Sequence, residues 1–395
     1  MSINRRQVLK RGAAGITLVA AGGLVWRAWD NGVFSAGQGA PYELWSGWRA
    51  EALDGPQAVA RAGILAASAH NTQPWTFRLG EDSVALSADP ARHLGSFDPF
   101  RREMALSLGC AVENMALTAG AQGVYTLVRP EPGLRTSDLD TAVRAAFLLL
   151  DPLPTRPDRL FAAIDRRHTN RGPYDMARPL PPALKAALQA LPTDPDTRLF
   201  LFDADPARAA LGRLIVSSTA TIIADPAMAA DSARWFRFRR ADIDHYRDGI
   251  TLDAAGLSWP VNLAAKMIAA PTPEVADRQW LNATRGVHVA SAPVFGVIAV
   301  RDLYGLANAL EAGRLWQRIH LWATVNGLAA QPLNQPLELI DRARQLGKPP
   351  ATARELEALV GDPAWRPTFV FRIGHAERSA KPSPRRAVDD VIMES

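Results

Sequence analysis

The sequence predicts an α+β fold made of two similar halves, with antiparallel-rich sheets around two long central helices. Apolar residues recur at helical spacing over 98–123 and again over 310–328, and strand-like runs flank both helices. When Gly109 is aligned with Gly313, further glycine, leucine and alanine positions coincide along the two helices. We therefore expect duplication of one α+β module, fused into a single chain.

Turn and cap residues define the individual elements. The runs 76–79 and 83–87 flank Gly80-Glu81-Asp82, which predicts a hairpin. Asp98 predicts a helix N-cap, because Pro99 then occupies the first helical position. The other strands are expected at 124–128, 142–150, 198–202, 293–300 and 368–373, and the other helices at 57–66, 160–167, 181–191 and 261–269.

A proline-rich stretch at 151–157 is the best candidate boundary between the halves. We expect a first half at 41–155 and a second half at 156–395, with an insertion at about 225–285. Within the insertion, 235–249 is rich in arginine, aspartate and aromatic residues. This segment is expected either to fold over a site as a lid or to form a charged surface helix.

Residues 1–40 form a separate signal or linker segment. Arg5-Arg6 precede a weakly apolar run at 13–26, which is shorter than the ~20 residues of a membrane span. The pattern resembles a twin-arginine export signal, and the alternative is a plain basic start to a helix. We therefore expect recognition by the twin-arginine export machinery, cleavage between 35 and 40, and a periplasmic location.

Composition limits the function classes. Hydrophobic residues make up 48% and charged residues 22% of the chain, and the net charge of +5 suits an anionic small ligand. No basic block interleaved with aromatic residues predicts nucleic-acid binding. The single cysteine, Cys110, excludes an internal disulfide and is expected to be buried. We find no catalytic triad, P-loop, dinucleotide fingerprint or metal motif.

The stretch 67–75 carries a dense set of neutral hydrogen-bonding groups. Ser68, His70, Asn71 and Gln73 lie between a predicted helix and a strand, and Pro74 makes the entry to that strand rigid. Such donors and acceptors suit a flat heteroaromatic ring with alternating N–H and C=O edges. The alternative is a polar turn whose side chains bond their own backbone.

The motifs resemble the nitroreductase family of FMN flavoproteins, and in particular its tandem, Acg-type branch. Four segments carry the resemblance: the Ser-x-x-Asn-x-Gln-Pro-Trp pattern of 68–75, Arg167-His168-Thr169-x-Arg171, Gln331-Pro332-Leu333-Asn334 after Gly327-Leu328, and Pro384-Arg385-Arg386. It covers residues from about 50 to 392 and is weakest between 225 and 285.

The resemblance implies an FMN site. Arg167 and Arg386 are the first candidates for the phosphate, followed by Arg171 and Arg385, with Thr169 as a hydroxyl donor. Asn71 and Ser68 would meet the ring edge, Gln73 would support the loop, and Gln331, Pro332 and Leu333 would form a turn beside the ring. The complete expected cofactor-binding set is Ser68, His70, Asn71, Gln73, Arg167, His168, Thr169, Arg171, Gln331, Pro332, Leu333, Arg385 and Arg386.

The order of these motifs predicts one site per chain. The first half has the Asn-Gln-Pro-Trp loop without an Arg-His-Thr segment before it, and the second half has the reverse. Ordinary family members are homodimers in which each flavin lies across the subunit interface. We therefore expect a monomer with an internal pseudo-dimer and one flavin between its halves.

The resemblance also implies the chemistry. The family passes a hydride from a nicotinamide donor to flavin N5 and then to a small electron-poor acceptor, such as a quinone or nitro compound. We therefore expect an FMN-dependent oxidoreductase with NAD(P)H as a candidate donor and no catalytic side chain, since the flavin carries the chemistry. The alternatives are a flavin-sequestering or storage protein with little turnover and, third, flavin-dependent oxygen chemistry.

Overall fold

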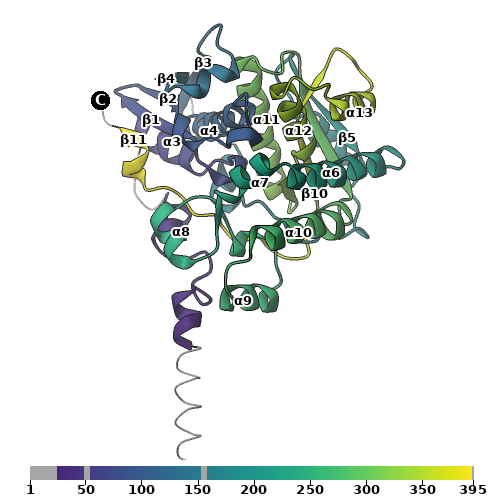
Figure 1. Ribbon diagram of the computed structural model, residues 1–395. Coiled ribbons are helices and arrows are strands. Elements are labelled where there is room, and N and C mark those ends of the chain that lie inside the picture. The colour runs from purple at the N-terminus through teal and green to yellow at the C-terminus, as the bar shows by residue number, and fades with distance from the viewer. Residues whose placement is uncertain (1–24, 49–53, 153–157, 394–395) are drawn as a thin grey trace, which may run out of the picture.

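The computed structural model describes residues 25–48, 54–152 and 158–393. The paired arginines at 5 and 6, nearly all of the apolar run 13–26, and residues 153–157 of the expected boundary lie outside these ranges. Two main β-sheets enclose a pair of long helices (Figure 1). The predicted α+β class is confirmed.

The first sheet has the strand order β11-β1-β2-β4-β3. Trp75 pairs with Ala88 in the β1–β2 hairpin, which confirms the predicted hairpin. β11 comes from the C-terminus and pairs parallel with β1, so that Phe77 lies opposite Ile392 (Figure 1). The strands are β1 Trp75–Gly80, β2 Ser83–Ala88, β3 Val124–Pro130, β4 Arg144–Pro152 and β11 Ile392–Met393.

The second sheet has the order β5-β8-β10-β9, and all its neighbours are antiparallel. Every residue of β8 is buried. The strand is an unbroken apolar run because helices cover the sheet that contains it. α11 packs against β8, β9 and β10, α6 packs against β8, and α12 and α13 pack against β10. The strands are β5 Thr197–Phe202, β8 Val294–Val300, β9 Ala329–Pro332 and β10 Arg366–Gly374.

The two long helices, α4 (Arg102–Ala121) and α11 (Leu306–Val325), pack against each other between the sheets. Gly109 and Gly313 lie at their crossing, where a Cβ on either residue would overlap a backbone carbonyl of the other helix. The crossing therefore requires glycine on both helices. Within the described residues, α4 and α6 are long and apolar enough to span a membrane by length and composition, and most of α4 is buried in this fold.

The start of α4 differs from the prediction. The helix begins at Arg102 because Arg101 adopts a left-handed conformation with φ of 57°, which interrupts any helix from Asp98. Asp98 nevertheless caps the helix, since its carboxylate accepts from the backbone N–H groups of Glu103 (3.1 Å) and Met104 (2.9 Å). The predicted capping residue was right, and its position relative to the helix was wrong.

The remaining helices surround this core. α7–α10 and the small sheet of β6 (Phe236–Arg237) and β7 (Ile250–Thr251) fall within the predicted insertion, and α8 and α9 lie below the main body in Figure 1. The helices are α2 Glu43–Gly47, α3 Gly55–Ile64, α5 Pro182–Gln189, α6 Ala207–Ala224, α7 Pro226–Ala233, α8 Arg240–Tyr246, α9 Trp259–Met267, α10 Pro273–Ala283, α12 Gln335–Gln345 and α13 Ala351–Val360.

The main apolar core is continuous across both halves. It joins Phe77 and Leu108 of the first half to Trp316 and Phe371 of the second. Cys110 belongs to this core and is 1% exposed, which confirms its predicted burial. Because one core includes both sheets, the relative position of the two halves is fixed by packing.

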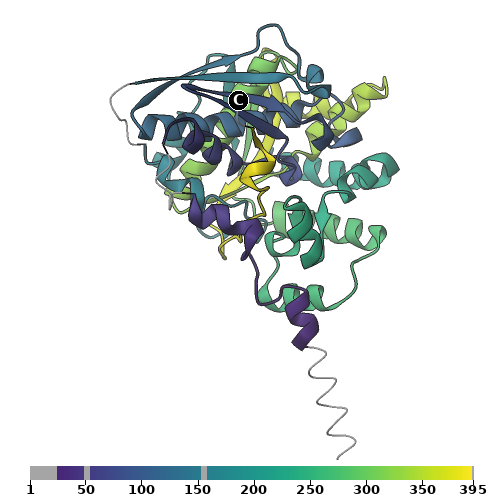
Figure 2. The same ribbon diagram turned by 90° about the vertical axis from the view of Figure 1, so that its left-hand side faces the viewer.

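Residues 41–45 and 383–385 meet beside the loop that follows α3. The indole Nε1–H of Trp45 donates to the carbonyl of Ser383 (2.8 Å), and the backbone N–H of Arg385 donates to the carbonyl of Pro41 (2.7 Å). Figure 2 shows the purple N-terminal segment next to the yellow C-terminal segment. Three segments distant in sequence, 41–45, 383–385 and the loop after α3, therefore lie side by side.

Candidate functional site

The polar loop at 68–75 has an unusual backbone. His70, Asn71 and Gln73 adopt left-handed φ angles of 48°, 56° and 52°. Such angles are uncommon outside glycine and cost about 1 kcal/mol or more each, so the surrounding contacts must maintain them. The hydroxyl of Ser68 accepts from the backbone N–H of Gln73 (3.1 Å) and holds the turn. Strain of this kind is typical of ligand-binding loops.

Asn71 joins the loop to two other segments. Its amide Nδ2 donates to the carbonyls of Gly249 (3.2 Å) and Pro384 (3.0 Å), and its Oδ1 accepts from the guanidinium of Arg385 (2.6 Å). Residues 247–249 therefore fold onto the loop, whereas Arg240–Tyr246 form a charged and largely exposed helix, so the segment 235–249 has features of both alternatives. The Asn71 side chain orients Arg385 rather than facing open space.

Gln73 and Arg386 brace the loop from its other side. The Gln73 amide donates to the carbonyl of Arg247 (2.9 Å), and its Oε1 accepts from the backbone N–H of Arg386 (2.9 Å). The Arg386 guanidinium donates to the carbonyls of Gln73, Trp75 and Asp390. Arg386 thus anchors the C-terminal segment to the loop and shares no described partner with Arg167.

Arg167 and Arg385 meet at a single backbone oxygen. Both donate to the carbonyl of Leu65, at 3.1 Å and 3.4 Å, and Arg385 also donates to the carbonyl of Ala66 (3.1 Å). The two residues are only 2% and 3% exposed. Arg167 lies just after the short 3-10 helix Phe161–Arg166, so the fold brings one arginine from each of two distant segments to the end of α3.

This pair of arginines carries uncompensated positive charge. Among the described residues neither forms an ion pair with a carboxylate, and the Nε atom of each is buried without a partner. Burial lowers the pKa of Arg167 to about 10, and burial with the neighbouring Arg167 charge lowers the pKa of Arg385 well below its ordinary value. Two buried like charges are costly unless an anion pairs with them. The arrangement therefore fits a multiply charged anion.

Two neutral histidines complete this cluster. His320, on α11, lies 3.2 Å through Nδ1 from Arg167 and 3.3 Å through Nε2 from the carbonyl of His168. Burial and the Arg167 charge lower the pKa of His320 well below its ordinary value, so Nδ1 accepts and Nε2–H donates. Burial and the two arginines likewise lower the pKa of His168 to about 3, and its buried Nδ1 has no partner.

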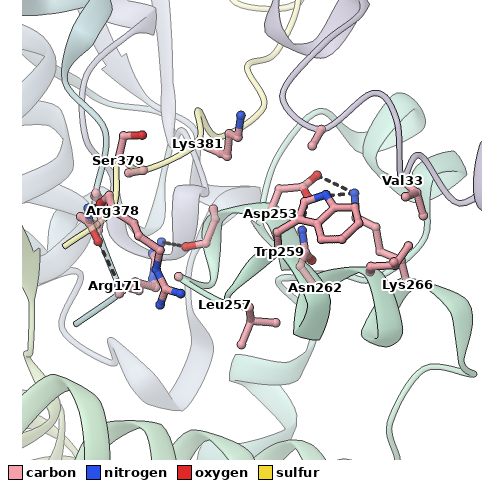
Figure 3. Close-up of a pocket in the computed structure, with 18 of the residues that line it drawn as sticks. Val33, Arg171, Asp253, Leu257, Trp259, Asn262, Lys266, Arg378, Ser379 and Lys381 are labelled. Carbon is pink, nitrogen blue, oxygen red and sulfur yellow. Dashed lines mark hydrogen bonds and ion pairs between the residues drawn. The ribbon is translucent and has the colours of Figure 1, made fainter. Parts of the chain in front are cut away.

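A pocket of about 360 Å³ opens next to this cluster, at Thr169 and Arg171. Figure 3 shows Arg171 and Arg378 on one side of it, and Val33, Asp253 and Lys266 on the other. The lining residues are Val33, Phe34, Ala36, Gln38, Thr169, Asn170, Arg171, Gly172, Asp253, Ala254, Gly256, Leu257, Trp259, Asn262, Leu263, Lys266, Arg378, Ser379, Ala380 and Lys381. Three of its walls therefore come from segments outside the predicted site.

The pocket has a net positive lining. The carboxylate of Asp253 is paired with Lys266 (2.8 Å) and accepts from Asn262 (2.8 Å). Arg171 donates to the carbonyl of Ala254 (3.0 Å), forms no described ion pair, and has a pKa lowered to about 10 by burial. Because its acidic group is already neutralised, the pocket attracts anionic or electron-rich groups towards Arg171.

Arg171 also links the pocket to the loop at 68–75. Burial, followed by the charge of Arg171, lowers the pKa of His70 to about 4. The His70 ring lies 3.2 Å through Nε2 from the hydroxyl of Ser232 and makes an edge contact with Phe97 at 5.3 Å between centroids. His70 is therefore neutral, and its ring packs against Ser232 and Phe97 and does not line the pocket.

The segment after α11 is a strand and not the predicted turn. The turn after α11 ends at Leu328, whose backbone N–H donates to the carbonyl of Ala323. Gln331 and Pro332 therefore lie beyond the turn, in β9, which pairs with β10. The side chain of Gln331 accepts from Arg372 (2.7 Å), and the backbone N–H of Leu333 donates to the carbonyl of Val370 (2.8 Å). None of these three residues lines the pocket.

Several residues around the site were not singled out in the sequence. Arg372 is fully buried, donates to the carbonyl of Gly172 (2.6 Å) and lies over the ring of Tyr174, so it fixes the segment that carries Arg171. The only indication of this role in the sequence is that Arg372 interrupts the apolar run of β10. Trp45 and Lys266 lie in segments that resemble no flavin motif. Long-range contacts alone reveal their position.

Curated proteins that are similar to this chain are named as nitroreductases. No family model matches the chain. Two curated Mycobacterium tuberculosis proteins, of strains CDC 1551 / Oshkosh and H37Rv, are each named "Putative NAD(P)H nitroreductase". Each is 26% identical to this chain over 352 residues, which cover 85% of this chain and 90% of the relative. The nitroreductase family is supported.

Solved nitroreductases also align with the chain. The FMN-dependent nitroreductase NfnB of Mycobacterium smegmatis, in complex with NADPH, is 17% identical with a TM-score of 0.38. That alignment covers 60% of this chain and 96% of NfnB. A nitroreductase of Desulfitobacterium hafniense DCB-2 with bound FMN is 15% identical with a TM-score of 0.35, and the alignment covers 60% of this chain and 97% of that one.

Proposed function

We propose that this chain is an FMN-dependent oxidoreductase of the nitroreductase type that acts on a small electron-poor acceptor, with NAD(P)H as the electron donor. The observation that carries the proposal is the buried pair Arg167 and Arg385, which converge on Leu65 without a described carboxylate partner. Arg167 and Arg385, whose buried Nε–H groups have no partner, would hold a phosphate dianion that supplies the missing negative charge. The names of the curated relatives support the same activity.

The residues present fit two parts of FMN at two places, the buried arginine pair and the pocket, and neither Arg167 nor Arg385 lines that pocket. Arg167, Arg385 and His168 would hold the phosphate, because their buried nitrogen atoms lack partners. The pocket at Thr169 and Arg171 would take the flavin ring. Bound FMN would supply two-electron transfer between the donor and the acceptor.

The protein's own groups would set the electrostatics around the ring. Arg171 presents a positive charge in a partly dry pocket, where it stabilises negative charge on a reduced ring more strongly than water does. Phe34, Leu257 and Trp259 give the same pocket an apolar wall that suits a flat aromatic acceptor. We place no side chain in a proton-transfer role, since the flavin carries the chemistry.

We further propose that the two halves form an internal pseudo-dimer with one flavin site. The first half supplies the loop with Asn71 and the end of α3, and the second half supplies Arg167, Thr169 and Arg171. The C-terminal segment then crosses back and adds Arg385. Because each half contributes different groups, one chain assembles one site and need not dimerise to complete it.

We also propose export by the twin-arginine machinery to the periplasm, on the basis of Arg5, Arg6 and the run 13–26. This route fits a protein that must fold around its cofactor before it crosses the membrane. Replacement of both arginines by lysine in a cell that expresses the full chain should retain the protein in the cytoplasm. Unchanged fractionation of that variant would contradict the proposal.

The cofactor assignment is tested by titration of the purified protein with FMN and with riboflavin, which lacks the phosphate. We expect FMN to bind at least 100-fold more tightly, since charge-assisted bonds contribute about 1.5–3 kcal/mol each. Arg167→Ala and Arg385→Ala should remove most of this preference. The control Arg239→Ala changes a side chain that is 74% exposed and should have no effect. Equal affinity for FMN and riboflavin would contradict the phosphate site.

The electron donor is tested by anaerobic stopped-flow mixing of the FMN-loaded protein with NADPH. Rapid bleaching of the flavin absorbance, followed by reoxidation with a nitroarene or quinone, is the expected result. Flavin that stays oxidised with both NADPH and NADH would contradict NAD(P)H as the donor. That outcome would favour flavin sequestration.

A further inference from the structure

The N-terminal strap, defined here as residues 31–48, is bonded to the body of the protein around the candidate site. Lys266 Nζ donates to the carbonyl of Gly32 (2.9 Å), and the Arg240 guanidinium donates to the carbonyls of Ser35 (3.3 Å) and Gln38 (3.0 Å). The carbonyl of Pro41 accepts from the backbone N–H of Arg385. The strap is therefore fastened at several points along its length.

The first part of the strap forms a wall of the pocket. Val33, Phe34, Ala36 and Gln38 line it opposite Arg171, and Figure 3 shows Val33 beside the Asp253–Lys266 pair. Without these residues the pocket would lose a complete side. The sequence pattern had assigned this part of the chain to a signal or linker, with cleavage between 35 and 40.

Trp45, in the second part of the strap, lies on the arginine cluster. Its ring centroid is 4.5 Å from Cζ of Arg385 and 5.7 Å from Cζ of Arg167, and its ring makes an edge contact with His168 at 4.6 Å between centroids. Trp45 is 7% exposed, and its Nε1–H is held by the carbonyl of Ser383. One indole thus touches every residue assigned to the phosphate.

Trp45 can stabilise the two guanidinium groups without neutralising them. The negative face of an indole attracts cations, most strongly where water is excluded. A carboxylate in the same place would pair with the arginines and compete with a phosphate, whereas an indole leaves their charge available. Its flat, fixed ring also limits the directions in which the guanidinium groups can turn.

We propose that the N-terminal strap is a permanent part of the cofactor site, in which Trp45 is a positioning residue that holds Arg167 and Arg385 ready for the phosphate. This inference rests on the proposed FMN-binding function. It implies that FMN cannot leave the protein unless the strap loosens. It also implies that any processing of the chain leaves residues from Asn31 onward in place.

The role of Trp45 is tested by FMN and riboflavin titrations of Trp45→Ala and Trp45→Phe in the full chain. We expect Trp45→Ala to weaken FMN binding about tenfold or more and to weaken riboflavin binding much less, because a desolvated cation–π contact contributes roughly 2 kcal/mol. Trp45→Phe should recover part of the FMN affinity, since its ring still faces the arginines. The control is Trp29→Ala, which removes an indole that is 74% exposed.

The outcomes separate a positioning role from other roles. An equal loss of FMN and riboflavin affinity, together with a lower melting temperature, would show a merely structural role and overturn the inference. Unchanged or tighter FMN binding in Trp45→Ala would also overturn it, because Trp45 would then have no part in the site or would obstruct it. Absence of FMN binding by the native protein would instead contradict the proposed function on which this inference rests.

The closure by the strap is tested by the rate of FMN release. Arg240→Ala removes the bonds to Ser35 and Gln38 and should speed release several-fold, whereas the neighbouring Arg239→Ala should not. Equal release rates in the two variants would overturn the closure. The intact mass of the protein isolated from cells tests retention of the strap, and an N-terminus beyond Asn31 would contradict it.

Discussion

Gly109 and Gly313 make reciprocal contacts where α4 and α11 cross. A Cβ on Gly109 would overlap the carbonyl oxygen of Leu310, and a Cβ on Gly313 would overlap the carbonyl oxygen of Leu106. Each glycine thus faces the residue three positions before the other glycine. This reciprocity supports the proposal that the halves derive from one module, because it is the contact expected between two copies related by a two-fold axis.

Gly109→Ala and Gly313→Ala should each destabilise the protein by about 1–3 kcal/mol, since a methyl group must push two packed backbones apart. The two losses should be similar because the contacts are reciprocal. Urea denaturation followed by circular dichroism provides the measurement. Gly286→Ala is the matched control, because nothing lies within 4 Å of a Cβ at that position. Stability that is unchanged in both core variants would contradict this account of the helix crossing.

The paired arginines, Arg167 and Arg385, carry a cost in stability in the flavin-free protein and make cofactor binding possible. Replacement of Arg385 by Met keeps much of the side-chain volume and removes a buried charge that has no described counterion. We expect Arg385→Met to change the melting temperature of the flavin-free protein little, because removal of the unpaired charge offsets the lost bonds to Asn71, Leu65 and Ala66, and to abolish the large stabilisation by added FMN. Calorimetry with and without FMN tests both parts. A large loss of stability in the flavin-free variant would show that Arg385 is structural.

Much of the fold could be predicted from the sequence because the relevant signals are local. The β1–β2 hairpin follows from its turn residues, and the long helices follow from apolar spacing. The segment at 331–334 was misjudged, since Gln331 becomes part of a strand only through β10 and Arg372. The left-handed Arg101 has no sequence signal, so the start of α4 was placed too early.

The candidate site could likewise be predicted only where local motifs indicate it. Motif resemblance drew attention to Arg167 and Arg385, but it ranked Arg386 above Arg385. The structure places Arg385 on the shared carbonyl of Leu65 and commits Arg386 to Gln73 and the C-terminal segment. Adjacent arginines on an extended segment point in different directions, and only the tertiary contacts decide which one reaches the cluster. For the same reason Trp45, which the sequence places at the start of the first half, is not predicted to lie at the site.

A buried carboxyl group should make stability fall as the pH rises. Burial raises the pKa of Glu103 to about 8, although Arg102 opposes the shift. The folded chain then keeps a proton that the unfolded chain has lost, so the free energy of unfolding should decrease between about pH 4.5 and 8. Glu103→Gln should flatten this decrease and still accept the bond from Asn334. Urea unfolding across this range tests it, with the exposed Glu355→Gln as control.

Two partly buried histidines should make stability fall on the acid side. Burial, with nearby arginine charges, lowers the pKa of His70 to about 4 and that of His168 to about 3. Below pH 6.5 the unfolded chain gains protons that the folded chain rejects, so the free energy of unfolding should decrease as the pH falls to about 4. His70→Gln should reduce the slope by up to about 1.4 kcal/mol per pH unit. A slope identical to that of the native protein would contradict the neutral state of His70.

The number of FMN molecules per chain tests the central claim most directly. Protein saturated with FMN, freed of excess ligand and denatured, gives this number from flavin absorbance and quantitative amino-acid analysis. We predict one FMN per chain for the native protein and none for Arg167→Ala or Arg385→Ala. Two FMN molecules per chain, or none in the native protein, would contradict a single flavin site assembled between the halves.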